Sequence, residues 1–222
     1  KLRSHNNAIL GVDVAGMGRD CTVYCKRFDN YVESFDKHNS GGKADHMKVA
    51  GRIKNEITIH SGYSVSIDTI GEGAGVYSRA VEICQESNGK LDEETIISCK
   101  YSEGAKTSSG KDLTDITGQY TFANMRAYLF WAVRDWLNPD NNTGAMLPPG
   151  GSFMEEATEI KWSFLSNGKI IIEPKEDIKE RLGHSIDEFD ALANTFHPKA
   201  VEMTGVNALP NYGDEDIDDI LY

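Results

Sequence analysis

Three aspartates stand at positions where the ends of neighbouring elements would bring carboxylates together. Asp13 lies near the end of an apolar run over residues 8–14, and Asp68 ends a second run over 63–68. Asp190 belongs to a short amphipathic segment near the C-terminus. Ligand sites of α/β proteins form where adjacent strands end. Carboxylates crowded at such a place repel one another and bind protons more tightly unless a cation lies between them.

The cation that fits such a cluster is a hard divalent ion, Mg²⁺ or Mn²⁺, because these ions prefer oxygen ligands. Two such ions about 4 Å apart can activate water and stabilise the leaving oxygen of a phosphodiester. Most of the 35 acidic residues must be solvated surface groups. Asp13 differs from them, because an acid inside an apolar run needs a partner or a function. We therefore predict a site for two ions on Asp13, Asp68 and Asp190.

The helix predicted over residues 185–196 indicates which of its acids faces the site. Its apolar stripe, at about 100° per residue, consists of Ile186, Phe189, Leu192, Ala193 and Phe196. Asp190 projects at the margin of this stripe, and Asp187 projects about 60° further toward solvent. Glu188 faces away, and we interpret it as the capping-box partner of Ser185. Asp190 is the predicted third ligand, with Asp187 in reserve.

The elements that must position these acids follow a simple order. We predict strands over 8–14, 22–28 and 31–35, a helix over 43–60, a strand over 63–68, a helix opened by 71–75, a strand over 95–101, a largely buried helix over 122–137, a hairpin of 160–165 and 169–172, and the helix 185–196. Three consecutive antiparallel strands followed by strand–helix alternation predict an α/β fold, a mixed sheet with helices on both faces. This is the order of the ribonuclease-H-like fold with an added β-hairpin, although other α/β folds are compatible with it.

The composition indicates a folded domain and an acidic tail. The chain has 222 residues, 39% of them hydrophobic and 26% charged, which permits a sizeable core. We expect a domain over residues 1–198 and a flexible tail over 199–222. The net charge of −12 excludes a passive DNA coat but not a site that collects divalent cations. The sequence begins with Lys1 and not with Met, so we expect a piece of a longer protein.

Several other classes of protein are excluded by motif. The four cysteines are too few and too scattered for a disulfide scaffold, and none forms a CxxC pair. We interpret them as buried, reduced thiols of a cytosolic protein. The longest apolar stretch is far shorter than the ~18 residues of a membrane span. No Gly-Lys pair is followed by Ser or Thr, so the sequence has no P-loop.

Three segments resemble the signature segments of the large terminase subunit of tailed bacteriophages, specifically those of its C-terminal nuclease domain. They are GVDVAGMGRDCTVY at 11–24, IDTIGEGAGVYSRAVE at 67–82 and HSIDEFDALANTF at 184–196. The resemblance spans about residues 8 to 198, in the family's order. It places the family's acids on Asp13, Asp68 and Asp190, with Asp187 one helical turn away.

This resemblance implies a function and a set of partners. It implies a metal-dependent endonuclease that cuts concatemeric viral double-stranded DNA during genome packaging, by hydrolysis at two metal ions. The implied partners are double-stranded DNA and, in the full packaging motor, the small terminase subunit and the portal protein. The packaging ATPase domain is expected to be missing from this chain. The implied location is the host cytoplasm, transiently at the procapsid portal, with no membrane.

Contact with DNA would have to come from local basic groups, because the overall charge opposes it. Arg19 lies in the turn after Asp13. The other candidates flank the polar loop or the hairpin: Lys100, Lys106, Lys111, Lys161, Lys169, Lys175 and Lys179. Taken singly, each lysine is more often a solvated surface group. The resemblance favours a hairpin close to the acids.

Some features have two interpretations. The loop 71–75 is either an anion-binding nest at a helix N-terminus or a turn that returns the helix to the sheet, and we favour the turn. We interpret Glu72 as solvated and His184 as a surface residue. The segment 207–222 is either a docking segment, as the family's C-terminal end is for the portal, or solvated chain.

Three alternatives to this function remain open. A Holliday-junction-resolvase-like nuclease of the same fold would prefer branched to linear DNA. An actin-like or sugar-kinase ATPase fragment would bind ATP, although such proteins need two domains and a second phosphate loop. A non-catalytic portal-docking module would bind no divalent ion, and the acids Asp13 and Asp68 argue against it.

Overall fold

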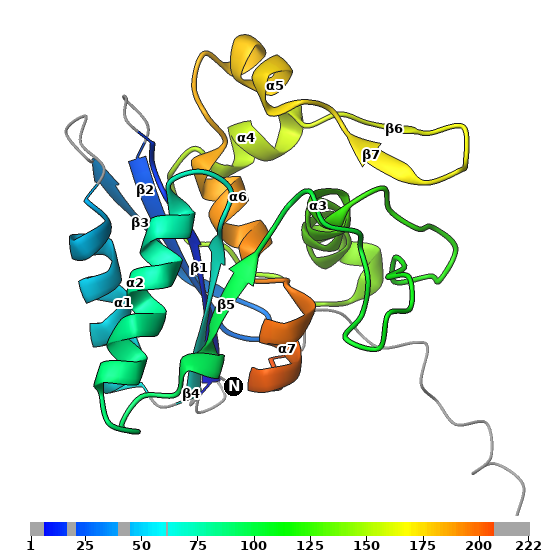
Figure 1. The fold of residues 1–222 in the computed structure, drawn as a ribbon. Coiled ribbons are helices and arrows are strands. Elements are labelled where there is room, and N and C mark those ends of the chain that lie inside the picture. The colour runs from blue at the N-terminus through cyan, green and yellow to red at the C-terminus, as the bar shows by residue number, and fades with distance from the viewer. Residues whose placement is uncertain (1–6, 17–20, 40–44, 61, 207–222) are drawn as a thin grey trace, which may run out of the picture.

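The computed structural model describes residues 7–16, 21–39, 45–60 and 62–206 (Figure 1). At its centre is a five-stranded sheet with the order β3-β2-β1-β4-β5. The strands are β1 (Asn7–Asp13), β2 (Cys21–Arg27), β3 (Val32–Asn39), β4 (Gly62–Asp68) and β5 (Ile96–Cys99). The pairs β1–β2 and β2–β3 are antiparallel, and β1–β4 and β4–β5 are parallel. The predicted mixed α/β sheet is confirmed.

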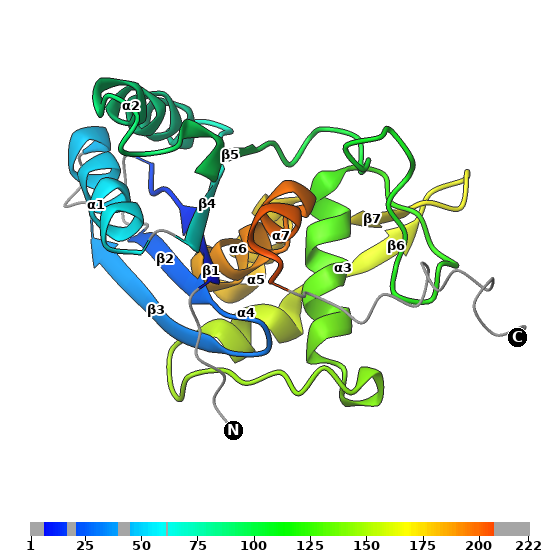
Figure 2. The same ribbon diagram turned by 90° about the horizontal axis from the view of Figure 1, so that it is seen from below.

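Helices cover both faces of the sheet, as Figure 2 shows from below. On one face lie α1 (His46–Ile59) and α2 (Gly73–Glu86), and on the other lie α6 (Asp187–Asn194) and α7 (Pro198–Thr204). Six of the seven residues of β1 are buried, because a central strand with helices on both sides exposes neither face. This double coverage explains why the run before Asp13 is continuously apolar and does not alternate.

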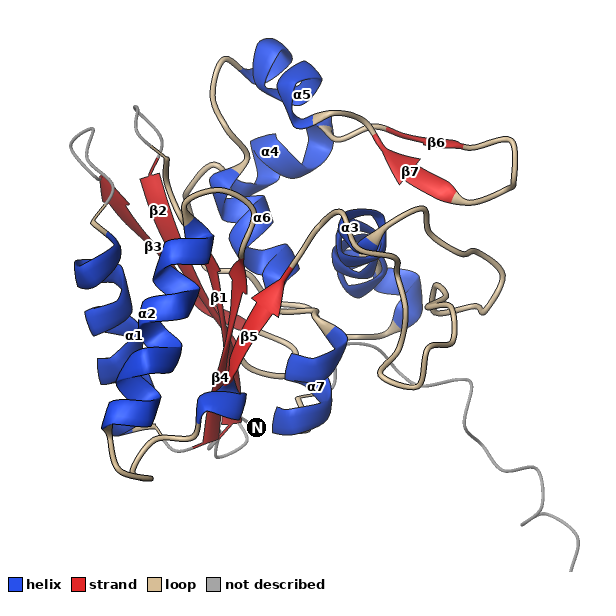
Figure 3. Ribbon diagram, viewed as in Figure 1, coloured by secondary structure: helices blue, strands red, loops and turns tan. Residues whose placement is uncertain are grey.

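The remaining elements form a second layer beyond α6, around α3 (Met125–Leu137) (Figure 3). They are α4 (Phe153–Glu159), the hairpin β6 (Trp162–Phe164) and β7 (Ile170–Ile172), α5 (Lys175–Leu182) and the short 3₁₀ turn Pro139–Asn141. A second 3₁₀ turn, Glu93–Thr95, precedes β5 and packs against α2 and β4. The predicted hairpin is confirmed, with Gly168 at a φ of 79° in its turn.

Three short helices were not predicted from the sequence. Helices α4, α5 and α7 have seven or eight residues each, too few turns for an apolar period to be recognised. Helix α6 ends at Asn194, before the predicted end at residue 196. Pro198 is the first residue of α7, a position where the amide N–H that proline lacks would have no intrahelical acceptor. Helix α7 packs against β1 and β4, with Ala200 buried. The flexible tail was predicted to begin at residue 199, but residues 199–204 belong to α7; the rest of that tail, residues 207–222, lies outside the described residues.

The core consists of two main apolar layers, one on each side of the sheet. The layer under α1 and α2 includes Val49, Ile53 and Ala80. The layer between the sheet, α3 and α6 is larger and contains both Trp131 and Trp136. Cys25, Cys84 and Cys99 are buried free thiols, as the sequence predicted, whereas the free thiol of Cys21 is partly exposed. Within the described ranges, no helix is long and apolar enough to cross a membrane.

Helix α6 lies directly on the middle strand because Gly11 has no side chain. A Cβ at this position would lie 1.9 Å from the carbonyl oxygen of Ala191 and 2.8 Å from the Thr195 methyl group. The first contact is with backbone, which cannot move without moving the helix. Gly11 therefore sets the distance between β1 and α6.

Candidate metal centre

Asp13 and Asp68 end two neighbouring parallel strands. Val12 pairs with Ile67 in the β1–β4 register, so the two acids follow at the same edge of the sheet. Asp13 is buried, with 8% of its surface exposed. Asp68 is partly buried, and its Oδ1 accepts a hydrogen bond from Ile70 N–H at 3.0 Å. The sheet topology brings together two acids that are 55 positions apart in the sequence.

Helix α6 brings two more carboxylates to this edge. Asn194 Nδ2 donates to the carbonyl oxygen of Val12 at 3.0 Å, which ties α6 to the strand that carries Asp13. Asp190 is 1% exposed, whereas Asp187 is partly exposed, so their order of burial agrees with the helical-wheel prediction. Asp187 Oδ2 accepts a hydrogen bond from Cys21 N–H at 3.3 Å.

Burial, together with the neighbouring carboxylates, raises the pKa of Asp13 and of Asp68. The pKa of Asp13 is raised well above its usual 3.8, mainly by burial. Lys175 opposes this rise, and the carboxylates of Asp190, Asp187 and Asp68 add to it. Burial also raises the pKa of Asp68 from 3.8 to about 6, against the Ile70 hydrogen bond and with a contribution from Asp190. Four interacting acids of this kind favour a bound cation.

Lys175 supplies the positive charge in this arrangement. Its Nζ lies 2.6 Å from Asp190 Oδ2. Burial alone would lower the pKa of this ammonium group, but Asp190 and Asp13 raise it above its usual value. We predicted Lys175 as a DNA contact near the hairpin, whereas the structure places its side chain among the acids. Its ammonium group occupies the kind of position that a metal cation would take.

A cavity of 260 Å³ opens beside Asp13. Its lining consists of Asp13, Val14, Ala15, Gly16, Lys175, Glu176, Lys179, Ser185 and Asp187. Three acids and two lysines therefore line one opening. Asp68 and Asp190 do not line this cavity.

The acids are not drawn together into a preformed ligand cage. Within the described residues, no group of three or more His, Cys, Asp or Glu side chains is arranged to hold a metal ion. Three of the four carboxylates instead have a donor of their own: Lys175 for Asp190, Ile70 N–H for Asp68 and Cys21 N–H for Asp187. The donor set consists of oxygens and fits Mg²⁺ or Mn²⁺. Binding would require Lys175 to release Asp190.

Two residues at this site were missed in the sequence. Tyr101 Oη donates to the carbonyl oxygen of Asp190 at 3.2 Å and lies 3.4 Å from its Oδ1. Arg126 Nη1 donates to Glu173 O at 2.6 Å, which fixes the chain two residues before Lys175. The position of Tyr101 just after β5, the strand beside β4, was a usable signal. For Arg126 the sequence offers none.

Of the other predicted DNA contacts, Lys179 lines the same cavity as Asp13 and Lys175, whereas Lys100, Lys106, Lys111, Lys161 and Lys169 do not. Arg19 is outside the described residues. Lys100 pairs with Glu103, and Lys106 and Lys169 share Asp112. Lys111 and Lys161 are exposed. No residue of the hairpin lines the cavity beside Asp13, and Figures 1 and 2 both place α3 between the sheet and the hairpin.

The glycine-rich loop is a turn that packs α2 onto the end of β4. Gly71 has a φ of 77°, and a Cβ on Gly73 would lie 1.8 Å from the carbonyl oxygen of Asp68. Glu72 is partly exposed, and its Oε2 lies 2.7 Å from His46 Nε2 on α1. His184 is a surface residue, as predicted, with Nδ1 donating to Ser185 O at 2.8 Å.

The prediction for Glu188 was wrong. The first helical residue of α6 is Asp187, preceded by Ile186, and Ile186 provides no side-chain cap. Instead of capping Ser185, Glu188 is 2% exposed and its Oε2 accepts from Ser152 N–H at 2.8 Å. Its Oε1 lies 2.9 Å from Lys37 Nζ. The helical wheel failed here because α4 and β3 cover the side of α6 that the wheel assigned to solvent.

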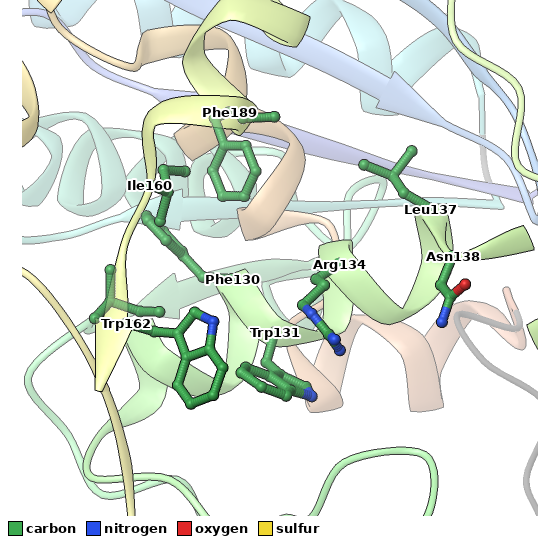
Figure 4. Close-up of a pocket in the computed structure, with 10 residues that line it drawn as sticks. Phe130, Trp131, Arg134, Leu137, Asn138, Ile160, Trp162 and Phe189 are labelled. Carbon is green, nitrogen blue, oxygen red and sulfur yellow. The ribbon is translucent and has the colours of Figure 1, made fainter. Parts of the chain in front are cut away.

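A second cavity, of 500 Å³, lies on the other side of α6 (Figure 4). This cavity is lined by Phe189 of α6 and by Phe130, Trp131 and Arg134 of α3. Arg134 lies over the Trp131 ring, 4.4 Å from its centroid. The lining is mainly apolar and carries no carboxylate. A metal centre therefore belongs to the acidic edge of the sheet and not to this cavity.

Comparison with known proteins identifies the fold. No protein-family profile matches the chain, and no curated protein sequence matches it. Among solved structures, the nuclease domain of the large terminase subunit gp2 of bacterial virus Sf6 is similar, with a TM-score of 0.62 and 20% identity over 88% of this chain and 90% of that one. The same values hold for a variant of that domain with manganese and beta-thujaplicinol.

A second phage protein has a similar structure. The large terminase nuclease from thermophilic phage G20c with bound magnesium matches with a TM-score of 0.50 and 15% identity, over 86% of this chain and 80% of that one. The chain thus has the fold of the nuclease domains of phage large terminase subunits, and the ribonuclease-H-like prediction is confirmed.

Proposed function

We propose that this chain is the nuclease domain of a phage packaging terminase and cuts double-stranded DNA with the help of divalent cations. The observation that carries the proposal is the meeting of Asp13, Asp68, Asp187 and Asp190 at one edge of a sheet, in the fold of terminase nucleases. Two of the similar structures contain manganese or magnesium, which supports metal use here.

The aspartates have separate roles in this proposal. Asp13, Asp68 and Asp190 would hold two Mg²⁺ or Mn²⁺ ions. Asp187 would either bind an ion through water or take the place of Asp190 as the third ligand. The ions would supply charge stabilisation and a water nucleophile for phosphodiester hydrolysis. The raised pKa of Asp68, about 6, keeps this carboxylate ionised only near neutral pH and above, so ion binding weakens in acid.

Lys175 has two roles in the proposal. Before ion binding it neutralises Asp190, which keeps a buried carboxylate from standing unpaired. After release from Asp190 it faces the cavity together with Lys179. There both ammonium groups can bind phosphate oxygens of the DNA backbone, since each is a flexible point charge.

The partners of the packaging motor belong to the same proposal. They are double-stranded DNA, the small terminase subunit, the portal protein and the packaging ATPase, acting in the host cytoplasm. The cutting of concatemers and the two-ion mechanism are parts of the proposal too. The fold match favours it over an actin-like ATPase fragment, whereas a junction-resolving nuclease differs only in its preferred DNA.

The test is plasmid nicking by the chain as it stands. Supercoiled DNA should be nicked in Mn²⁺ or Mg²⁺ without ATP, and excess EDTA should stop the reaction. Asp13→Asn should abolish nicking while the protein stays folded. Undiminished nicking in EDTA would refute the metal mechanism, and faster cutting of branched than of linear DNA would favour the resolvase.

A further inference from the structure

The first turn of α6 is capped by another helix. A helix begins with amide groups that lack an intrahelical acceptor, and Ile186 at the start of α6 supplies no side-chain cap. Phe189 N–H instead donates to Glu156 Oε2 of α4 at 2.8 Å. Glu156 is 1% exposed. A buried carboxylate at a helix N-terminus is stabilised by the amide groups and by the helix dipole, and it fixes the helix in return.

Glu156 is itself held by a closed set of contacts. Its Oε1 accepts from Ser152 Oγ at 2.6 Å, and Lys37 Nζ donates to the same Ser152 Oγ at 2.8 Å. The lysine also pairs with Glu188, which accepts from Ser152 N–H. Gly151 permits the close approach, because its φ is 79° and a Cβ there would lie 2.8 Å from both Glu188 carboxylate oxygens.

The other end of α6 is held by a cation. Arg27, on β2, is completely buried, and its Nη2 donates to Thr195 O at 2.7 Å. Its Nε donates to Thr195 Oγ1 at 2.7 Å. A positive charge at the C-terminal end and a negative charge at the N-terminal end both complement the helix dipole. The helix is therefore fixed along its axis from α4 and from β2.

This fixation matters because α6 carries two of the acids. Asp187 lies two residues before Phe189, and Asp190 directly follows it. Metal–ligand distances tolerate deviations of only about 0.2 Å, so a small shift of the first turn would misplace both carboxylates.

We propose that Glu156 is a positioning residue for the metal centre: its carboxylate, held by Ser152, which Lys37 and Glu188 fix in turn, caps α6 and sets the positions of Asp187 and Asp190. This inference rests on the proposed function. Glu156 does not contact the site itself, so it acts through the helix, and its removal should change ion affinity before it changes chemistry.

The experiment measures Mn²⁺ binding by calorimetry and nicking rate against Mn²⁺ concentration. Glu156→Ala should weaken Mn²⁺ binding about tenfold, as loss of an orienting partner does, and saturating Mn²⁺ should restore most of the rate. Glu156→Gln keeps one oxygen that can accept from Phe189 N–H and should recover most of the affinity. Glu155→Ala, the exposed neighbour on α4, is the matched control and should bind as the wild type does.

A second control separates positioning from general stability. Ile53→Val removes a methyl group from the layer on the opposite face of the sheet. It should lower the Tm without changing Mn²⁺ affinity. If Glu156→Ala does not fold, Ser152→Ala, which removes one donor to Glu156, should still weaken binding about threefold.

Two negative results have different meanings. If Glu156→Ala folds and binds Mn²⁺ with wild-type affinity, the positioning role alone is overturned. If Glu156→Ala does not fold, wild-type Mn²⁺ affinity of Ser152→Ala has the same meaning. A wild-type protein that binds no Mn²⁺ would overturn the proposed function and this inference with it.

Discussion

Replacement of Asp68 by asparagine should stabilise the metal-free protein while it destroys nicking. Each tenfold change in proton affinity is worth about 1.4 kcal/mol. The rise of the Asp68 pKa from 3.8 to about 6 therefore costs the ionised, folded protein about 3 kcal/mol relative to the unfolded chain. Asp68 is partly exposed, so solvent screening reduces this figure, and we expect a gain of about 1–3 kcal/mol.

Asparagine suits this position because it keeps the local hydrogen bond. Its Oδ1 can accept from Ile70 N–H as the carboxylate does. The variant therefore removes the charge and little else. For a chain of this length each kcal/mol corresponds to about 2–4 °C in Tm, so Asp68→Asn should melt roughly 2–12 °C above the wild type at pH 8 in EDTA.

The pH dependence gives the sign of the effect. Because the folded pKa of Asp68 is raised, the stability contributed by the protonated carboxyl is fully present below pH 3.8 and is lost as the pH rises through about 6. The advantage of the asparagine variant should accordingly shrink between pH 7 and pH 4. Added Mn²⁺ should stabilise the wild type more than the variant. Equal or lower stability of Asp68→Asn at pH 8 in EDTA would refute the reasoning.

Three further predictions concern the same edge of the sheet. Lys175→Met leaves Asp190 buried without its partner, so the free energy of unfolding of the metal-free protein in urea should fall by about 2–4 kcal/mol. The variant should nevertheless bind Mn²⁺ at lower concentrations, because no ammonium group competes with the ion. Weaker Mn²⁺ binding would contradict this. Asp190→Asn should abolish nicking and Mn²⁺ binding, whereas the more exposed Asp187→Asn should cost less, and the opposite order in parallel Mn²⁺ titrations would exchange their roles. Gly11→Ala should cost more than about 3 kcal/mol, because the new Cβ meets the backbone of α6; near-wild-type unfolding would show that α6 can move away.

The sheet and the acids on it could be predicted because their signals are local. An acid after an apolar run ends a strand, so Asp13 and Asp68 were recognisable from their immediate neighbours. The relative burial of Asp190 and Asp187 followed from one helical period. These features need no knowledge of what packs against them.

The contacts between distant elements could not be predicted in this way. Glu188 was assigned to solvent because nothing in its helix shows that Lys37 and Ser152 cover it. Lys175 appeared to belong to the hairpin because it follows β7, and only the path of the chain through α5 brings it to Asp190. Such polar pairs lack the periodicity on which sequence interpretation depends.

The contact between Asn194 and Val12 has a consequence for the order in which the protein becomes able to work. These residues are 182 positions apart, so the acids on β1 and β4 leave the ribosome long before α6 is made. At about 5–20 residues per second, the interval between Asp13 and Asp190 is roughly 10–35 s. During synthesis the growing chain carries only Asp13 and Asp68 of the four carboxylates, and a product released before α6 lacks the rest. Incomplete copies of the proposed nuclease would thus lack part of its metal site.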